Sequence, residues 1–531
     1  MKVAVYDRYW PTAGGGEKFA AGIAAALAAD HDVTLLAHEP LDLDRLGERL
    51  QLDLSGVDVH QVEADRAGAV SAATAGFDLF VNASFLSRDT NRARRGVYVV
   101  HFPGFRPSAR HRAVGRVGRV ARTLGLSGGV EVSLGDGFYS PESARLHTLH
   151  WTSGEAELRV RAAKPGRHQV TLLLGRYVPP ALAPTEVTVE HDGQVLGRVT
   201  ITPPSGRLDR HRTIPLTFSV DIPAARGPTP PRPATEPVTV TLSSAGWVPH
   251  VLGLGADTRV LGVPVAGWYG GQGWRARIAA AVPLLATEQG ERFDALDSYD
   301  RVLSNSRYTQ GWVARMWQRD SGVLYPPVPS FARADEKKPI ILGVGRFFVP
   351  GTGHNKKQLE LVGAFRQLVE RGQADGWELH LVGGCAPEHQ AYLDQVRDAA
   401  TGLPVVLHPD ATGAELRTLY GEAAVFWHAA GLGEDVERHP ERQEHFGITT
   451  VEAMSAGAVP VVIDAAGQAE IVEQGVSGFR FGTVEELVTH TERLVGDAEL
   501  RATMSTAAEA RARDFGWDAF VASVRSQVLP S

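Results

Sequence analysis

Cysteine is almost absent from this chain of 531 residues, which contains only Cys385. A disulfide within the chain is therefore excluded. Long apolar runs are missing as well, since none approaches the roughly 20 residues that a membrane-spanning helix needs. The first ten residues, MKVAVYDRYW, mix charges with a strand-like pattern and do not resemble a signal peptide. We therefore expect a cytoplasmic protein.

A general excess of positive charge is also lacking, because the formal net charge is −7 with neutral histidine. This balance argues against nucleic-acid binding. One exception is the basic segment, residues 105–125, which reads FRPSARHRAVGRVGRVARTLG and has no acidic residue. Its arginines are Arg106, Arg110, Arg112, Arg116, Arg119 and Arg122. The segment is either a solvated surface or a site of peripheral contact with anionic lipid headgroups, at about 1 kcal/mol per well-placed cation.

The chain is too long for one hydrophobic core, so two or three domains are expected. The run KVAVY at 2–6 is followed by the glycine-rich GGGEK, an alanine-rich helical stretch and the run VTLLA. This order is typical of a βαβ unit in a parallel sheet. From residue 339 onward, PIILGV, WELHLVGG, PVVLH, AVFWH and VPVVI alternate with helical stretches. The fold class is therefore α/β, with two Rossmann-like, doubly wound sheets and a cleft between them.

Between these parts lies a stretch with strand-length runs and no helical period. Examples are ELRVR, HQVTLLL and LTFSVDI, and Asp192-Gly193 stands where a hairpin turn belongs. This composition predicts an inserted all-β sandwich. The expected domains are an N-terminal domain of residues 1–128 and 268–335, the sandwich at 130–265, a C-terminal domain at 336–515, and a final helix at 516–531 that packs back toward the N-terminal domain.

Cations and carboxylates fall at the predicted strand ends of the C-terminal domain. Arg346 follows the strand PIILGV, and Lys356 and Lys357 begin the next helix. Glu444 lies in the loop before a helix that starts near Gly447, and Glu452 lies further along that helix. Cations suit a diphosphate, a helix start favours an anion, and carboxylates accept hydrogen bonds from sugar hydroxyls. A nucleotide sugar needs all three kinds of contact.

These motifs resemble the retaining GT-B glycosyltransferases of family 4, the glycosyl transferases group 1. That family has two glutamates separated by seven residues, here EHFGITTVE, an Arg and Lys pair before them, and a GGxxEIV segment after them, here AGQAEIV with Ala466 at the first glycine. SNSRYTQGWVARMW, VLYPPV and YVVHFP are similar to the α-1,2-mannosyltransferases of asparagine-linked glycosylation. The resemblance covers about 1–128 and 268–531.

The resemblance implies roles for individual residues. Glu444 contacts the transferred hexose, Glu452 contacts the ribose, and Arg346 and Lys356 neutralise the diphosphate. His101, at the end of YVVH, lies near the sugar and the acceptor hydroxyl. The catalytic set is thus Glu444, His101, Arg346 and Lys356. The donor-binding set is Gly14, Gly15, Gly16, Lys357, Phe446, Gly447, Ile448 and Glu452.

The implied reaction moves a hexose from a nucleotide diphosphate sugar, GDP-mannose or a UDP-hexose, to a glycan or lipid-linked acceptor. No metal or other cofactor is expected. Alternatives are a nucleotide-sugar epimerase or hydrolase of the same fold, and a non-catalytic glycan-binding protein. A metal site around His428, His439 and His445 is less favoured, because no ligand spacing there matches a known motif. The Asp42-Leu43-Asp44 sequence reads as a helix N-cap rather than a metal-binding DxD.

Overall fold

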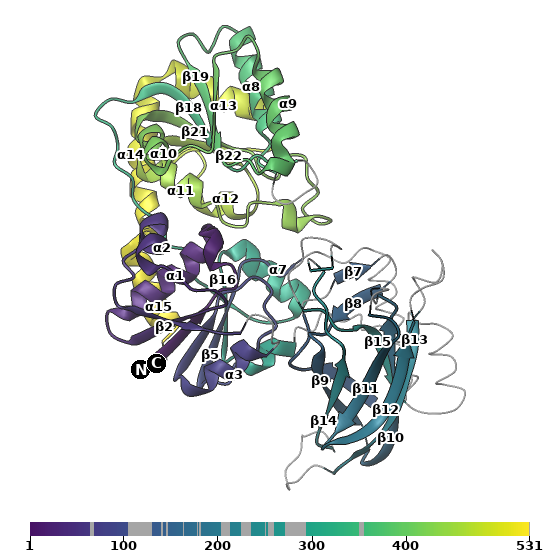
Figure 1. Cartoon of the computed structure of the whole chain (residues 1–531). Coiled ribbons are helices and arrows are strands. Elements are labelled where there is room, and N and C mark those ends of the chain that lie inside the picture. The colour runs from purple at the N-terminus through teal and green to yellow at the C-terminus, as the bar shows by residue number, and fades with distance from the viewer. Residues whose placement is uncertain are drawn as a thin grey trace.

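The computed structural model of this chain consists of two α/β domains and an all-β part (Figure 1). It describes residues 1–63, 68–104, 130–139, 142–144, 147–162, 164–177, 179, 182–202, 213–224, 235–249, 251–252, 260–270, 294–349 and 355–529. The basic segment from Arg106 to Arg122 lies outside the described residues. Within the described residues, no helix is both long and apolar enough to cross a membrane.

The described part of the N-terminal domain has a seven-stranded parallel sheet in the order β17-β16-β5-β4-β1-β2-β3. Its strands are β1 (Lys2–Tyr6), β2 (Asp32–Ala37), β3 (Val57–Gln61), β4 (Leu79–Asn82), β5 (Arg95–Val100), β16 (Arg301–Ser304) and β17 (Gly322–Val323). Its helices are α1 (Gly15–Ala28), α2 (Leu43–Leu50), α3 (Ala69–Ala73) and α7 (Arg307–Trp317). Val3, Ala4 and Val5 are all fully buried, as expected for a parallel strand that is covered on both faces.

The described residues of the all-β part form two antiparallel sheets that enclose an apolar core. One sheet contains β13 (Thr213–Ile222), β10 (Gly166–Gly175), β15 (Pro264–Gly270), β8 (His147–Trp151) and β7 (Glu142–Ala144). The other contains β12 (Gln194–Ile201), β11 (Thr185–His191), β14 (Val238–Ser244), β9 (Glu155–Ala162) and β6 (Val130–Leu134). Buried and exposed residues alternate along β9, as on a strand with one core face.

Two details of the sandwich bear on the sequence predictions. The hairpin between β11 and β12 turns at Asp192 and Gly193, which have φ of 48° and 76°. Positive φ at both positions is the signature of the tight turn that the Asp-Gly pair predicts. The expected sandwich boundary at 265 falls inside a strand, because β15 stays paired with β10 as far as Gly270.

The described part of the C-terminal domain has a six-stranded parallel sheet in the order β20-β19-β18-β21-β22-β23. Its strands are β18 (Lys338–Val344), β19 (Glu378–Gly383), β20 (Val405–Pro409), β21 (Ala423–His428), β22 (Val459–Ile463) and β23 (Phe479–Phe481). Its helices are α8 (Gln358–Glu370), α9 (Gln390–Ala400), α10 (Gly413–Glu422), α11 (Ile448–Ser455), α12 (Ala466–Ile471), α13 (Val484–Gly496) and α14 (Ala498–Ala512). The chain reverses direction along the sheet between β18 and β21, and such switch points carry the ligand crevices of these folds.

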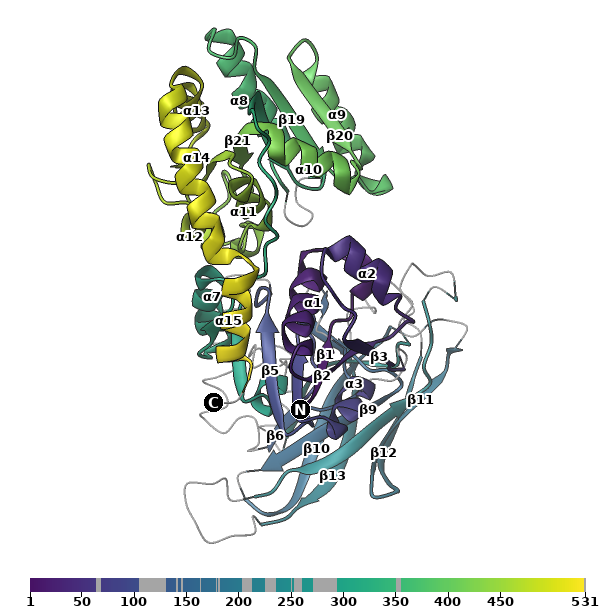
Figure 2. The ribbon, with the colours of Figure 1, turned by 90° about the vertical axis from the view of Figure 1, so that its left-hand side faces the viewer.

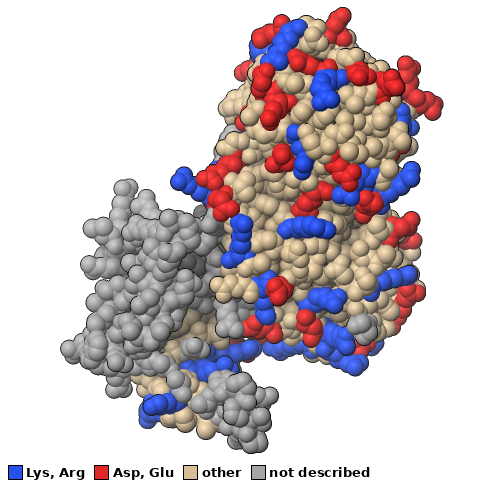
Figure 3. Space-filling view, turned by 180° about the vertical axis from the view of Figure 1, so that it is seen from behind, with Lys and Arg blue, Asp and Glu red and all other residues tan. Residues whose placement is uncertain are grey.

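The two α/β domains are joined by a linker around Pro327–Pro329 and by the C-terminal helix. Beyond α14 the chain returns to the N-terminal domain as α15 (Trp517–Gln527), which lies against α1 (Figure 2). The rings of Phe520 and Phe19 are 6.1 Å apart there. Seen from behind, acidic and basic side chains are interspersed over both α/β domains (Figure 3).

Candidate active site

Glu444 is the centre of a small polar cluster at the strand ends of the C-terminal domain. Its Oε2 atom lies 2.5 Å from Nζ of Lys356 and 3.1 Å from Nε2 of His428. His428 ends β21 and is only 3% exposed. Burial lowers the pKa of His428, although the hydrogen bond to Glu444 opposes the shift. A neutral His428 that donates its Nε2–H to the carboxylate accounts for this geometry.

The hydrogen bond between His428 and Glu444 is not predicted from the sequence. The sequence pattern groups His428 only with His439 and His445, as metal ligands. The structure separates the three, because His439 contacts Glu441 at 3.1 Å and the His445 ring stacks on Phe102. Among the described residues no group of His, Cys, Asp or Glu is arranged to hold a metal ion. The sequence signal that could have identified His428 as a site residue is its position at the end of a predicted strand.

Arg346 and Lys356 both lie near the end of β18. A Cβ atom on Gly345 would lie 2.5 Å from Cγ of Lys356, so the lysine stem passes directly over the residue before Arg346. The Arg346 guanidinium lies 4.9 Å from the ring centroid of Phe348 and is exposed. Within the described residues Arg346 forms no ion pair. One cation at this strand end is therefore accessible, and the other is held by Glu444.

Lys357 has a different environment from Lys356. Its Nζ atom lies 2.9 Å from Glu434 and 3.9 Å from Glu360. Glu434 also contacts Arg442 at 3.1 Å. Burial raises the pKa of Glu434, but the two cations outweigh that effect and the net shift is downward. The ion pair ties Lys357 to the loop between β21 and α11, so a donor contact by Lys357 would require this pair to open.

The loop that carries Glu444 leads into α11 through Gly447. Gly447 has a φ of 116°, and a Cβ atom there would lie 2.2 Å from Nε2 of Gln468. Both the conformation and the space require glycine. Phe446 is 3% exposed, and its ring lies 5.4 Å from that of Tyr325. Only the backbone of Phe446 is therefore placed to meet a ligand.

Glu452 lies within α11 and is 8% exposed. It accepts a hydrogen bond from the Tyr420 hydroxyl at 2.8 Å and lies 3.9 Å from Nζ of Lys18 in the N-terminal domain. Burial raises the pKa of Glu452, and the charge of Lys18 opposes this shift. Lys18 belongs to the same GGGEK motif as the predicted glycines, but its contact with Glu452 is not predicted from the sequence. A charge pair thus crosses the domain interface at the predicted ribose site.

The glycine-rich loop lies between His101 and the C-terminal domain. A Cβ atom on Gly15 would meet Cδ1 of Ile448 at 3.3 Å, and one on Gly16 would meet Cε1 of His101 at 3.5 Å. Gly14 donates its N–H to the Glu17 carboxylate at 2.5 Å, and this hydrogen bond caps the N-terminus of α1. The glycines therefore allow the two domains and His101 to approach α1 closely.

His101 directly follows β5 and is well packed. Its Nε2 atom lies 2.6 Å from the carbonyl oxygen of Ala83, and its ring lies edge-on to Phe19 with 5.9 Å between centroids. Because a carbonyl can only accept, Nε2 carries the hydrogen and Nδ1 retains a lone pair. Burial lowers the pKa of His101, which keeps the ring neutral. A packing role and a role beside the acceptor are both compatible with this arrangement.

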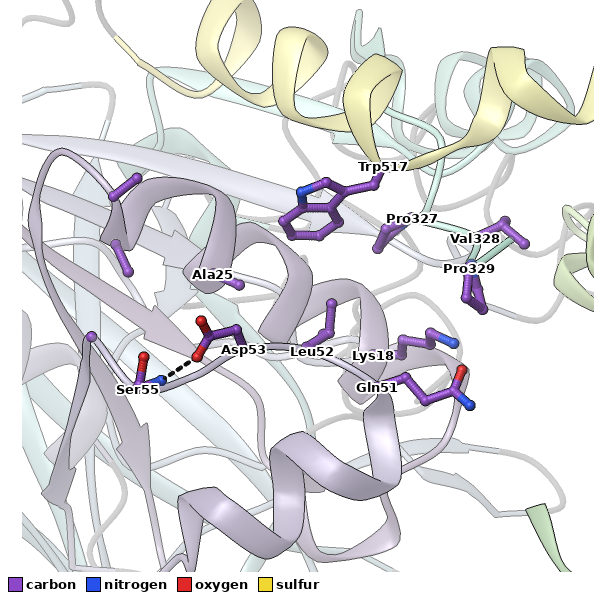
Figure 4. A pocket seen from close by; sticks show the side chains of 13 residues that line it. Lys18, Ala25, Gln51, Leu52, Asp53, Ser55, Pro327, Val328, Pro329 and Trp517 are labelled. Atoms are coloured by element: carbon purple, nitrogen blue, oxygen red, sulfur yellow. Dashed lines mark hydrogen bonds between the residues drawn. The ribbon is translucent and has the colours of Figure 1, made fainter. Parts of the chain in front are cut away.

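Two other candidates occupy places outside this cluster. Asp42 is the N-cap of α2 and accepts a hydrogen bond from the backbone N–H of Arg45, as the sequence predicts. A pocket of about 550 Å³ lies behind α1, between the loop at Gln51, the linker at Pro327–Pro329 and Trp517 (Figure 4). Its walls are mainly apolar, and one of its lining residues, Lys18, lies 3.9 Å from Glu452.

This chain is similar in sequence to one protein family and to two named proteins. The profile of the family described as Glycosyl transferases group 1 matches residues 329–511. The chain is 26% identical over 201 residues to the sulfoquinovosyl transferase of Arabidopsis thaliana, and 27% identical over 217 residues to the GDP-Man:Man(3)GlcNAc(2)-PP-Dol α-1,2-mannosyltransferase of Dictyostelium discoideum. Each match takes in 37% of this chain, and the chain covers 34% and 41% of the lengths of these relatives.

Two solved structures resemble the whole chain. HepE of Anabaena, in complex with UDP and glucose, superposes with a TM-score of 0.50 at 13% identity, over 99% of this chain and 98% of that one. A glycosyltransferase of Rickettsia africae gives 0.50 at 9% identity, over 100% and 99%. The family profile confirms the expected resemblance to group 1 glycosyltransferases for residues 329–511. The chain has the GT-B fold with an additional all-β part, and its residues 329–511 are a glycosyl transferases group 1 domain.

Proposed function

We propose that this protein is a retaining glycosyltransferase that moves a hexosyl group from a nucleotide diphosphate sugar to a hydroxyl group of a glycan or lipid-linked acceptor. The observation that carries the proposal is the cluster of Arg346, Lys356, Glu444 and His428 at the switch point of a group 1 domain. The named activities of the relatives support sugar transfer. The bound UDP and glucose of the Anabaena protein support a nucleotide-sugar donor.

The proposed chemistry uses the cations on the leaving group. Arg346 is accessible, and Lys356 would exchange its contact with Glu444 for one with the diphosphate. Positive charge there stabilises the negative charge that develops as the bond between the anomeric carbon and the phosphate oxygen breaks. The acceptor oxygen bonds to the anomeric carbon on the same face, and its proton passes to the departing diphosphate. No metal ion has a necessary part in this scheme.

The carboxylates are assigned to the donor. Glu444, held by His428, would contact the hexose, while Glu452 would contact the ribose after Lys18 moves aside. Because Glu444 acts mainly in the transition state, Glu444→Gln should lower kcat by about tenfold or more and leave nucleoside diphosphate affinity unchanged. Isothermal titration calorimetry with the nucleoside diphosphate and steady-state transfer assays measure the two effects.

The first experiment identifies the donor. Thermal unfolding of the full chain is followed with a panel of GDP- and UDP-hexoses, since a ligand at about 100 times its Kd adds about 2.7 kcal/mol to stability. Transfer is then measured with glycan and lipid-linked acceptors, with and without excess EDTA. Donor consumption that is equally fast without acceptor would replace this proposal by a hydrolase or epimerase. Wild-type turnover of Glu444→Gln would remove the assignment of that residue.

A further inference from the structure

Three aromatic rings from both domains lie between the strand end of His101 and the loop of Glu444. Phe102 is the residue after His101, and His445 is the residue after Glu444. Their rings are parallel, with centroids 4.1 Å apart and an interplanar angle of 7°. Tyr308 adds a third near-parallel ring, 6.0 Å from Phe102 and 6.3 Å from His445. The two domains thus touch through the immediate neighbours of the two candidate catalytic side chains.

The start of α7 holds this stack in place. The Tyr308 hydroxyl donates a hydrogen bond to the carbonyl of Pro440 at 2.9 Å, in the C-terminal domain. Thr309, one residue further, donates its hydroxyl to the carbonyl of His101 at 3.3 Å. The carboxylate of Glu470 accepts the backbone N–H groups of Arg307 at 2.9 Å and Tyr308 at 2.6 Å. The stack is therefore connected by hydrogen bonds to both domains.

We propose that the Phe102–His445 stack is a positioning contact, which sets His101 of the acceptor side against Glu444 of the donor side when the domains are closed. This inference rests on the proposed glycosyl transfer. Consecutive Cα atoms are about 3.8 Å apart, so a displaced ring carries its neighbour with it. A misplacement of about 1 Å can cost about 100-fold in rate. Neither ring has to touch the substrate for the effect to occur.

Donor binding and catalysis respond differently to loss of the stack. The proposed donor contacts of Arg346, Lys356 and Glu452 all belong to the C-terminal domain, and the stack contributes to none of them. Removing one ring should therefore lower kcat while the Kd of the nucleoside diphosphate stays the same. A variant that keeps an aromatic ring should keep the alignment. This pattern separates a positioning role from a general loss of folded protein.

The test uses the full chain with Phe102→Leu, His445→Ala and His445→Phe. The matched control is His490→Ala, because His490 stacks on Phe479 with centroids 4.5 Å apart at 3°, within the C-terminal domain alone. We expect Phe102→Leu and His445→Ala to lose about tenfold or more in kcat, with nucleoside diphosphate Kd within about twofold of wild type. His445→Phe should retain most of kcat, and His490→Ala should be unaffected in rate.

Each result has a definite meaning. Normal kcat in both Phe102→Leu and His445→Ala overturns the inference while the proposed transferase function stands. A His445→Phe variant as poor as His445→Ala also overturns it, because the imidazole rather than the stack would then matter. If the wild-type chain transfers no sugar to any acceptor, the proposed function fails first and this inference falls with it. Should Phe102→Leu fail to fold, the two His445 variants decide.

Discussion

Replacing Ala466 by glycine is expected to stabilise the C-terminal domain. Ala466 begins α12 with a φ of 51°, which is the left-handed region. A side chain in that region costs an L-residue about 1–2 kcal/mol. The gain is partly offset, because glycine has about 0.4–1 kcal/mol more conformational entropy to lose from the unfolded chain. The net expectation is a stabilisation of about 0.5–1 kcal/mol, taken from the difference of these two effects.

The same helix supplies the control. Ala469 lies three residues later in α12, and its N–H donates to the carbonyl of Ala465 at 3.4 Å. Glycine at this right-handed position should destabilise the domain by about 0.5–1 kcal/mol. The two alanine-to-glycine changes are chemically identical and both positions are partly buried, so only the backbone conformation gives them opposite signs.

Differential scanning calorimetry of the full chain measures both variants. The transition that rises on addition of the nucleoside diphosphate marks the C-terminal domain, since a ligand stabilises the unit that binds it. For a domain of this size, about 1 kcal/mol corresponds to about 2–4 °C in Tm. Ala466→Gly should raise the Tm of that transition and Ala469→Gly should lower it. A lower Tm for Ala466→Gly would refute the reasoning from backbone strain.

Three further predictions concern polar side chains. Burial raises the pKa of Asp7 to about 8, above its ordinary 3.8, so the stabilisation from its protonated form is complete below the unfolded pKa and is lost as the pH rises through 8. The stability advantage of Asp7→Asn over wild type should therefore grow between pH 5 and pH 8, on the order of 1 kcal/mol per pH unit, and equal pH profiles in denaturant unfolding would contradict this. Glu470→Ala removes the acceptor of two backbone N–H groups at the start of α7 and should cost about 1.5–3 kcal/mol by the same measurement, whereas Glu470→Gln, which keeps an oxygen acceptor, should cost less. His428→Phe should lower kcat by about tenfold, His428→Gln should retain more activity, and neither should add a loss in a Glu444→Gln background; additive losses would show that His428 acts independently of Glu444.

The fold follows from patterns that are local in sequence. Apolar runs such as residues 3–6 and 459–463 are buried along their length, and parallel strands separated by helices leave few arrangements. The hairpin at Asp192 could be predicted because only a few residue types adopt positive φ at both turn positions. The C-terminal end of β15 could not be predicted, because the end of a strand depends on its pairing with the neighbouring strand.

The candidate site, like the fold, could be predicted from the sequence only in part. The order of residues along the chain predicts that Arg346, Lys356 and Glu444 lie at strand ends of one sheet, because the carboxyl ends of parallel strands share an edge. The partners of these side chains depend on packing, since Lys356 pairs with Glu444 whereas the adjacent Lys357 pairs with Glu434. Packing likewise places His428 against Glu444. Side-chain contacts between distant segments depend on packing distances of a few ångströms, and the order of residues along a chain does not encode these directly.

The contact between the domains could not be predicted from the sequence, for a related reason. The sequences YVVHFP and EHFGI indicate a strand end and a loop. Neither sequence predicts that the rings of Phe102 and His445 stack with their centroids 4.1 Å apart. Their meeting depends on how the linker and the C-terminal helix place two separately folded sheets. The sequence thus determined the two halves of the site, and the packing of one domain on the other decided how those halves face each other.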